Sequence, residues 1–293
     1  SPEGQCPTDR LIAGLDRVID PYEDDTFDDH LDVINFSIGG RGRPDEHEIA
    51  IAAENIIDVG VIFVASAGNS GPGCNCSDCY GPPCCSGRSG FCGGQFSGAE
   101  PDDYWYDDSG ESYSITCPGC AEKVIAVAAS DTEDDTIASF SSRGYTWPTH
   151  EQEAQGLPGN LKPDITAPGV SICAARLDNV YAGYQCLDNE HIAINGTSMA
   201  APHVTGVVAL LLEADPSLKG NPQEVKNILM NSATDLGYDH LTQGAGRVNA
   251  LSAVENYVVE QFCDDENCVD LWLEKESEGI WNVNYTTDSL IGG

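Results

Sequence analysis

Residues 61–66 form a continuous apolar run, Val-Ile-Phe-Val-Ala-Ser, which is rich in β-branched side chains. Such a run is typical of a central parallel strand that helices cover on both faces. Residues 31–37 have the pattern of a second short strand, and the apolar residues of 45–58 have helical spacing. Strand, helix and strand in this order form a βαβ unit. The sequence therefore predicts an α/β fold with a doubly wound, mostly parallel sheet and helices on both faces.

Both predicted strands end in short segments that contain glycine, and ligands bind at the carboxyl ends of strands in such sheets. The first strand is followed by Ser37, Ile38 and Gly39. The second strand is followed by Ala67, Gly68 and Asn69. These two strand ends are therefore the places where we expect a ligand to bind.

Residues 195–204, Asn-Gly-Thr-Ser-Met-Ala-Ala-Pro-His-Val, place a Gly-Thr-Ser turn directly before an apolar helical pattern. We expect Pro202 in the first turn of this helix and Pro216 just beyond its end. Ser198 then lies at the helix N-terminus, beside free backbone N–H groups and the positive end of the helix dipole. This position suits a serine nucleophile, although a serine that only caps a core helix shows the same local pattern.

These ten residues resemble the nucleophile segment of the subtilisin-like serine proteases, or subtilases. Residues 33–40 resemble the strand with which that family pairs substrate, and residues 65–71 resemble the segment that carries its oxyanion-hole asparagine. Residues 140–144, 162–170 and 244–250 also match subtilase segments, so the resemblance covers most of residues 9–256.

The resemblance implies a serine endopeptidase that hydrolyses peptide bonds through an acyl-enzyme. It implies that Ser198 is the nucleophile and that the Asn69 side-chain amide, an uncharged donor, stabilises the oxyanion with the Ser198 backbone N–H. It also implies a substrate groove lined by Ser37, Ile38, Gly39, Ala67 and Gly68. Because residues 67 and 68 are small, we expect an S1 pocket wide enough for a large apolar or aromatic side chain.

The family's catalytic aspartate and histidine motifs lie upstream of the substrate strand, where this chain has no room for them. None of the histidines is followed by Gly-Thr: His30, His47, His150, His191, His203 and His240. In the favoured interpretation the chain is the C-terminal part of a catalytic domain, with a sheet incomplete at its N-terminal side. An N-terminal segment or a second chain then supplies Asp and His, and the start at Ser1 without Met reflects zymogen processing or truncation. In the alternative, the chain is a catalytically inactive, subtilase-like peptide-binding or scaffold subunit.

Charge and cysteine content limit the classes of binding partner and the cellular location that we expect for this protein. The chain has 13 basic and 48 acidic residues and a net charge of −35, so nucleic acid and anionic membranes are unfavourable partners. No apolar run is long enough to span a bilayer. A polypeptide substrate is the expected partner. The 13 cysteines indicate a secreted, extracellular protein with disulfide bonds.

Residues 72–116 are interpreted as a cysteine-rich insertion with too few aliphatic side chains for a core of its own, so crosslinks must hold it. Disulfides are the favoured crosslinks, and the alternative is zinc bound by Cys76, Cys79, Cys117 and Cys120. We also expect disulfides joining Cys173 to Cys186 and Cys263 to Cys268. The chemistry needs no cofactor, and Ca²⁺ is expected only as a stabilising ion without assigned ligands.

The chain divides into a catalytic domain over residues 1–257, with the insertion at about 72–116, and a C-terminal extension over residues 258–293. Short alternating runs in the extension predict the start of a β-rich appendage. Residues 221–224, Asn-Pro-Gln-Glu, predict a helix that begins with a capping box and has Pro222 at its first position.

Overall fold

The structure is a computed structural model that describes residues 7–22, 29–71, 113–176, 184–260, 263–264, 267–277 and 280–287. The longer helices are α1 (Thr8–Ile19), α2 (Glu48–Asp58), α4 (Thr197–Ala214), α5 (Pro222–Asn231) and α7 (Ala250–Glu260). The short helices are α3 (His150–Ala154), the 3₁₀ turn η3 (Pro216–Leu218) and α6 (His240–Gln243). Most of the predicted cysteine-rich insertion lies outside the described residues.

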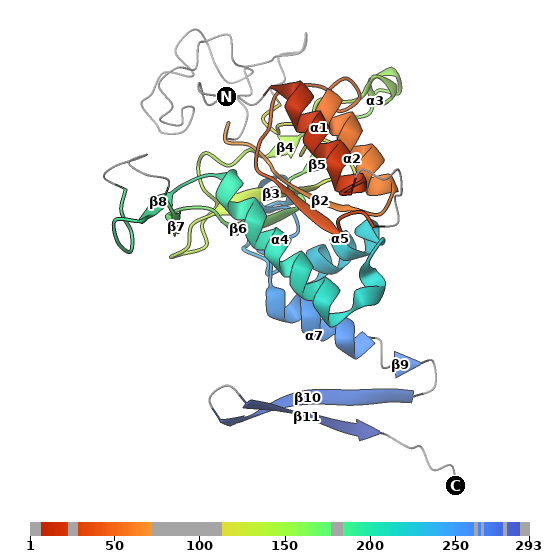
Figure 1. The fold of residues 1–293 in the computed structure, drawn as a ribbon, viewed down its shortest axis with the longest axis vertical. Coiled ribbons are helices and arrows are strands. Elements are labelled where there is room, and N and C mark those ends of the chain that lie inside the picture. The colour runs from red at the N-terminus through yellow and green to blue at the C-terminus, as the bar shows by residue number, and fades with distance from the viewer. Residues whose placement is uncertain are drawn as a thin grey trace.

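Four parallel strands form the central sheet in the order β1-β2-β3-β6 (Figure 1). They are β1 (Val33–Phe36), β2 (Ile62–Ser66), β3 (Ile125–Ser130) and β6 (Ile165–Pro168). Every residue of β2 and β3 is buried, and α2 connects β1 to β2 as the predicted βαβ crossover. The predicted doubly wound, mostly parallel α/β sheet is confirmed.

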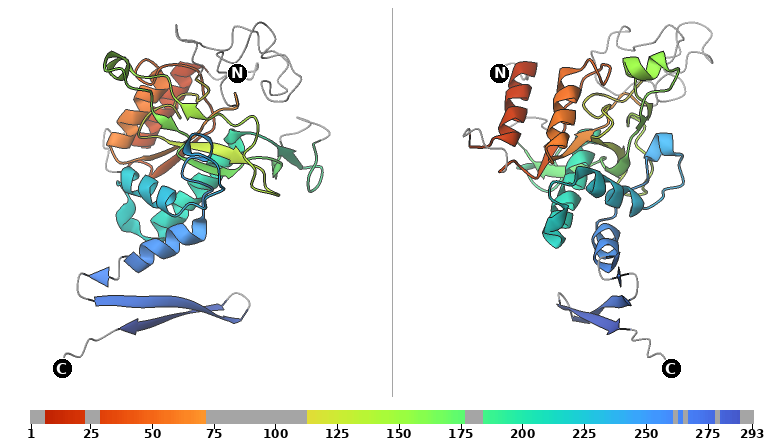
Figure 2. Two further views of the ribbon diagram at one scale, coloured as in Figure 1. Left: turned by 180° about the vertical axis from the view of Figure 1, so that it is seen from behind. Right: turned by 90° about the vertical axis from the view of Figure 1, so that its right-hand side faces the viewer.

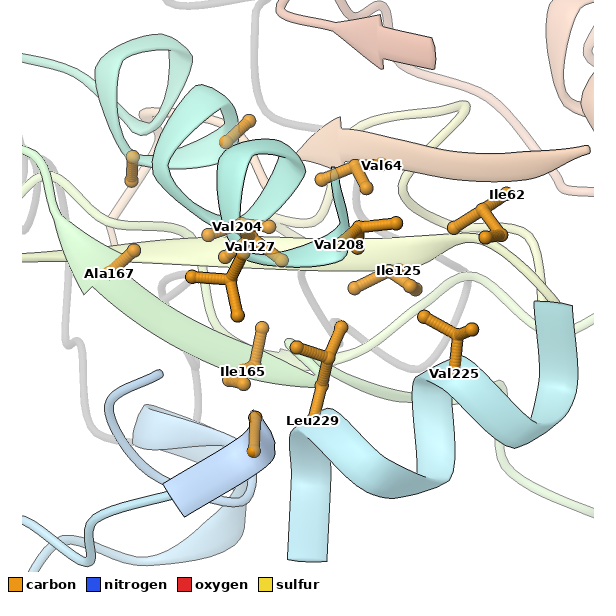
Figure 3. Close-up of a cluster of buried hydrophobic side chains, with 14 of the residues drawn as sticks. Ile62, Val64, Ile125, Val127, Ile165, Ala167, Val204, Val208, Val225 and Leu229 are labelled. Atoms are coloured by element: carbon orange, nitrogen blue, oxygen red, sulfur yellow. The ribbon is translucent and has the colours of Figure 1, made fainter. Parts of the chain in front are cut away.

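Helices cover both faces of this sheet, as Figure 1 and the right-hand view of Figure 2 show: α1 and α2 lie on one face, and α4, α5 and α7 on the other. On the second face, apolar side chains of β2, β3 and β6 meet those of α4, α5 and α7 in one cluster (Figure 3). Its labelled members include Ile62, Val127, Val208 and Leu229, each at most 2% exposed in the described structure. Such a cluster fixes how α4 and α5 sit on the strands.

The two edges of the sheet differ. The outer edge of β6 is covered, because Thr166 exchanges backbone hydrogen bonds of 2.8 Å with Gly246 and Val248. In the part of the chain that the structure describes, no strand covers the outer edge of β1. Beside that edge, α4 exposes Gly206, Ala209 and Leu210, the last of them 55% exposed. An uncovered strand next to an exposed apolar helix face is the surface that proteins usually bury.

Two local predictions are wrong. Pro202 lies inside α4, as its sixth residue, and not in the first turn. Asn221 does precede α5, and Pro222 is its first residue, but the Asn221 side chain makes no capping bond. Its Nδ2 donates instead to the carbonyl of Ser217 at 2.9 Å, because η3 ends directly before the helix and offers that acceptor. By length and composition α4 could span a membrane, yet 44% of it is buried within the fold, as in a core helix.

Two disulfides are present in the described residues, Cys173–Cys186 and Cys117–Cys120. The first confirms the predicted pair, and it lies in the hairpin of β7 (Ile172–Ala175) and β8 (His191–Ile194) that leads into α4. The second uses two of the sulfurs considered for zinc, while Cys76 and Cys79 lie outside the described residues. Both of its cysteines are fully buried.

The remaining strands are short or lie near the C-terminus. β4 (Gly144–Tyr145) pairs with β5 (Leu161–Lys162), and α7 is followed by β9 (Cys263–Asp264), β10 (Asn267–Ser277) and β11 (Ile280–Thr287). β10 and β11 form an antiparallel hairpin, and Cys268 lies opposite Cys263 in the ladder of β9 and β10. The domain boundary at residue 257 and the Cys263–Cys268 disulfide stay predictions.

Candidate active site

Three chain segments converge at the carboxyl end of the sheet: the end of β1, the end of β2 and the N-terminus of α4. Ser37 directly follows β1, Asn69 lies three residues beyond β2, and Ser198 is the second residue of α4. α4 packs across β1, β2, β3 and β6, so the buried face of the helix fixes its N-terminus over the strand ends. The structure thus brings together the predicted Ser198, Asn69 and Ser37.

Ser198 and Ser37 are joined by two reciprocal hydrogen bonds. The Ser198 hydroxyl donates to the Ser37 carbonyl at 3.0 Å, and the Ser37 hydroxyl donates to the Ser198 carbonyl at 2.8 Å. Both side chains are half-buried. A backbone carbonyl is not a base that can accept the serine proton, so these bonds position Ser198 without activating it.

The orientation of the Asn69 amide follows from its contacts with Thr197. The backbone N–H and the hydroxyl of Thr197 both lie 3.0 Å from Asn69 Oδ1. A backbone N–H can only donate, so the amide oxygen must face Thr197 and the NH₂ group must face the other way. The fully buried Thr197 hydroxyl also accepts from the backbone N–H of Gly68 at 3.2 Å. Thr197 therefore holds the amide in one orientation.

Two N–H donors flank the space that Gly196 leaves open. A Cβ built on Gly196 would lie 3.7 Å from Asn69 Nδ2 and 3.7 Å from the Ser198 backbone nitrogen. The φ of Gly196 is 156°. A carbonyl oxygen held in that space could accept from both donors, which is the arrangement that stabilises an oxyanion. Glycine adds no side chain to this space, and the nearest atom to it is Met199 Sδ at 3.5 Å.

The expected groove residues are not all accessible. Ile38 and Gly39 are exposed, whereas Ala67 and Gly68 are buried. Thr116 fills the space between them: a Cβ on Gly39 would lie 2.5 Å from Thr116 Oγ1, and a Cβ on Gly68 would lie 2.9 Å from Thr116 Cγ2. A side chain at position 39 or 68 would therefore collide with Thr116.

The six histidines all fall within the described residues, and none is hydrogen-bonded to Ser198. His203 Nδ1 contacts the Met199 carbonyl at 2.8 Å, and His191 contacts Asp188 at 2.7 Å. His150 lies between Asp45 and Glu46. Burial lowers the pKa of His47, which is only half-buried and lies against Gly40 and Gly42. In the described residues, the hydroxyl of Ser198 therefore has no histidine as a hydrogen-bond partner.

Comparison with known proteins identifies the family. A model described as the subtilase family matches residues 2–247. The chain belongs to the subtilase family. The assignment made from the sequence motifs is thus confirmed, and with it the subtilisin-like fold.

Curated subtilases are similar to this one over most of its length. Serine protease AprX of Bacillus subtilis (strain 168) is 32% identical over 260 residues, which cover 83% of this chain and 47% of AprX. Subtilisin DY of Bacillus licheniformis is 31% identical over 225 residues, which cover 77% of this chain and 57% of subtilisin DY. This subtilase chain therefore spans about half the length of the curated relatives it matches.

Among solved structures, the self-cleaved protease domain of PatA has a TM-score of 0.54 and 22% identity to this subtilase, and the match covers 87% of this chain and 70% of that one. The prenylagaramide maturation protease PagA also gives a TM-score of 0.54 at 22% identity, covering 86% of this chain and 68% of that one. At this identity the similarity shows the fold alone.

Sequence reasoning missed two residues of the site. Thr197 belongs to the recognised motif, but its sequence environment marks it only as the start of a helix. Thr116 precedes Cys117 and Pro118 and has no motif of its own. Its position between the two strand-end segments becomes visible only in the folded chain.

Proposed function

We propose that this chain carries the nucleophile and the oxyanion hole of a serine endopeptidase that cleaves polypeptides through an acyl-enzyme. The observation that carries the proposal is that Asn69 Nδ2 and the Ser198 backbone nitrogen each lie 3.7 Å from the Cβ position of Gly196, two residues before Ser198. In this mechanism Ser198 Oγ attacks the scissile carbonyl. The oxygen of the tetrahedral intermediate occupies the space at Gly196 and accepts from both donors.

The serine proton must pass to a base, which we propose is a histidine paired with an aspartate on a preceding segment or a second chain. Two observations support this. The Ser198 hydroxyl is bonded to a backbone carbonyl, and no histidine of the described residues reaches it. In addition, β1 has an outer edge that no strand of the described residues covers, and α4, which packs against β1, exposes Gly206, Ala209 and Leu210. A segment that adds a strand to β1 and packs on α4 would bring its own side chains to Ser198.

The substrate binds, in this proposal, as an extended chain along Ser37, Ile38 and Gly39, with its P1 side chain directed toward Thr116. Because Thr116 fills the space between Gly39 and Gly68, we propose that medium-sized apolar P1 side chains are preferred over large aromatic ones. The two disulfides of the described residues support an oxidising, extracellular location.

Labelling with a fluorophosphonate tests the proposal, because the reagent reacts only with a serine that is activated. The native material, with every copurifying chain present, should incorporate one label at Ser198, found by mass spectrometry. Ser198→Ala should abolish the labelling and provides the matched control. N-terminal sequencing of every chain in the labelled material should find one that carries the aspartate and histidine.

The inactive peptide-binding subunit predicts a different outcome. Here the bond of the Ser198 hydroxyl to the Ser37 carbonyl would be the permanent state, and native material would not be labelled. Measurable affinity for an extended peptide, unchanged in Ser198→Ala, would support that function and contradict the protease proposal. Metal analysis of the same material, with a thiol count, tests the zinc and calcium expectations.

A further inference from the structure

The carbonyl of Ser198 lacks its usual helical partner. In an α-helix each carbonyl accepts from the N–H four residues later, and for Ser198 that residue is Pro202, which has no N–H. The carbonyl is not left without a donor, because the Ser37 hydroxyl donates to it at 2.8 Å. A side chain from the end of β1 thus takes the place of a backbone bond inside α4.

The Ser37 hydroxyl has a second partner in Asn35, the third residue of β1. Asn35 Nδ2 donates to Ser37 Oγ at 3.0 Å. Since the hydroxyl of Ser37 has one proton and is already accepting from Asn35, that proton is free to go to the Ser198 carbonyl. On its other side, Asn35 Oδ1 lies 3.3 Å from the hydroxyl of Thr205. Thr205 lies in α4 and its hydroxyl also lies 3.1 Å from the carbonyl of Ala201.

These contacts link Asn35 in β1 with Ser37 after it and with Ser198 in the first turn of α4, and Asn35 also lies against Thr205 of the same helix. The bond from the Ser37 hydroxyl holds the carbonyl of Ser198, and the reciprocal bond to the Ser37 carbonyl holds the hydroxyl of Ser198. The Ser198 backbone nitrogen, which is one of the proposed oxyanion donors, belongs to the same residue. A displacement of the carbonyl by a few tenths of an ångström would therefore move both the nucleophile and the donor.

We infer that Asn35 and Ser37 are positioning residues that hold Ser198 in place by supplying the hydrogen bond that Pro202 cannot. The functional part of this inference rests on the proposed serine protease activity. The structural part does not, because it concerns only which group donates to the Ser198 carbonyl.

A double-mutant cycle in thermal stability tests the structural part. Ser37→Ala leaves the Ser198 carbonyl without a donor and should lower the Tm by roughly 2–10 °C. Pro202→Ala supplies the missing N–H, so Ser37→Ala in the Pro202→Ala background should lower the Tm by less than half as much. If Ser37→Ala lowers the Tm equally in both backgrounds, or not at all, the exchange of donors is refuted.

Labelling rates test the positioning role. In native material, Ser37→Ala should lower the fluorophosphonate labelling rate of Ser198 by about tenfold or more, and Ser37→Thr, which keeps the hydroxyl, should restore most of it. Asn35→Asp should be slower than Asn35→Ala, because a carboxylate would accept the Ser37 proton and withdraw it from the Ser198 carbonyl. A purely structural contact predicts the opposite order, because aspartate keeps the shape of asparagine.

The outcomes separate the two proposals. If wild-type native material is not labelled at all, the protease proposal fails, and the Tm cycle still decides the hydrogen-bond exchange. If the wild type is labelled but Ser37→Ala reacts at the wild-type rate, the protease proposal stands and the positioning role of Ser37 is refuted. Equal rates for Asn35→Asp and Asn35→Ala would refute the role of Asn35.

Discussion

Replacing Lys162 by methionine should remove a pH-dependent penalty on the folding stability. The Lys162 side chain is 2% exposed, and its ammonium lies 2.8 Å from the carboxylate of Asp164 and 2.7 Å from the carbonyl of Val124. Lys226 lies 2.8 Å from the same carboxylate, so two ammonium groups share one buried counter-charge. Burial lowers the pKa of Lys162 from 10.5 to about 8, against the attraction of Asp164.

The sign of the effect follows from the two pKa values of Lys162. In the unfolded chain this ammonium keeps its proton up to about pH 10.5, whereas in the folded chain it begins to lose the proton near pH 8. Between these values the unfolded state binds more protons, so the free energy of unfolding rises with pH, and below pH 8 the penalty is fully present. The difference in pKa corresponds to about 3 kcal/mol over the window.

Lys162→Met should be tolerated because every polar partner keeps a second contact. Asp164 retains Lys226 and the backbone N–H of Ala126 at 2.7 Å, and the carbonyls of Glu122 and Val124 retain Lys226. At pH 7 we therefore expect this variant to be as stable as the wild type, or more stable by about 1–3 kcal/mol. Asp164→Asn instead leaves both ammonium groups without a counter-charge and should lose about 3–5 kcal/mol.

Urea unfolding of wild type and both variants at pH 7, 8, 9 and 10, with free thiols blocked and ionic strength fixed, measures these differences. The stability of the wild type relative to Lys162→Met should rise across this range. A difference between the two that does not change with pH would refute the reasoning. So would a Lys162→Met variant that is less stable at pH 7 than Asp164→Asn.

Three further changes have expected outcomes. Asn69→Asp keeps the acceptor for Thr197 but loses the NH₂ donor. The kcat on a peptide substrate should therefore fall by about 10²–10³-fold or more, with the Tm nearly unchanged. A kcat within tenfold of wild type would contradict the oxyanion role. Thr116→Ala should enlarge the space between Gly39 and Gly68. The kcat/KM for aromatic P1 residues relative to medium-sized ones should then rise by about tenfold. An unchanged kcat/KM ratio across a series of peptides that differ at P1 would contradict this role of Thr116. Leu229→Ala, at a fully buried position, should lower the free energy of unfolding by about 2–5 kcal/mol, and a loss under 1 kcal/mol by urea denaturation would contradict the packing.

Patterns that repeat along the chain allowed the fold to be predicted. The apolar run at 61–66 has no polar position, and a strand of this kind is stable only when both faces are covered, so β2 and the layers around it followed from the sequence. The position of Ser198 at a helix N-terminus followed from a glycine-containing turn before an apolar helical pattern. The predicted doubly wound sheet and the helical start at Ser198 are both present.

Contacts with groups outside a recognised local motif could not be predicted. The capping box at Asn221 was expected from local spacing, but the neighbouring Ser217 carbonyl competed for the side chain. The wide S1 pocket was expected from the small size of residues 67 and 68, and this expectation took no account of Thr116, which comes from another part of the chain and lies against Gly39 and Gly68. In both cases the deciding group is absent from the local pattern. The orientation of Asn69 by Thr197 is a contact of the same kind.

The covered edge of β6 has a consequence for biosynthesis. Its partner residues, Gly246 and Val248, are far from β6 in the sequence, because α4, α5 and α6 all lie between them. The glycine at 244 is needed for this approach, because a Cβ there would lie 2.4 Å from the Asp164 carbonyl oxygen. Strands β1, β2 and β3 therefore leave the ribosome well before the segment that completes the sheet. Contacts of such long sequence separation form slowly, so the nascent sheet has to stay unaggregated until nearly all of residues 7–260 have been synthesised.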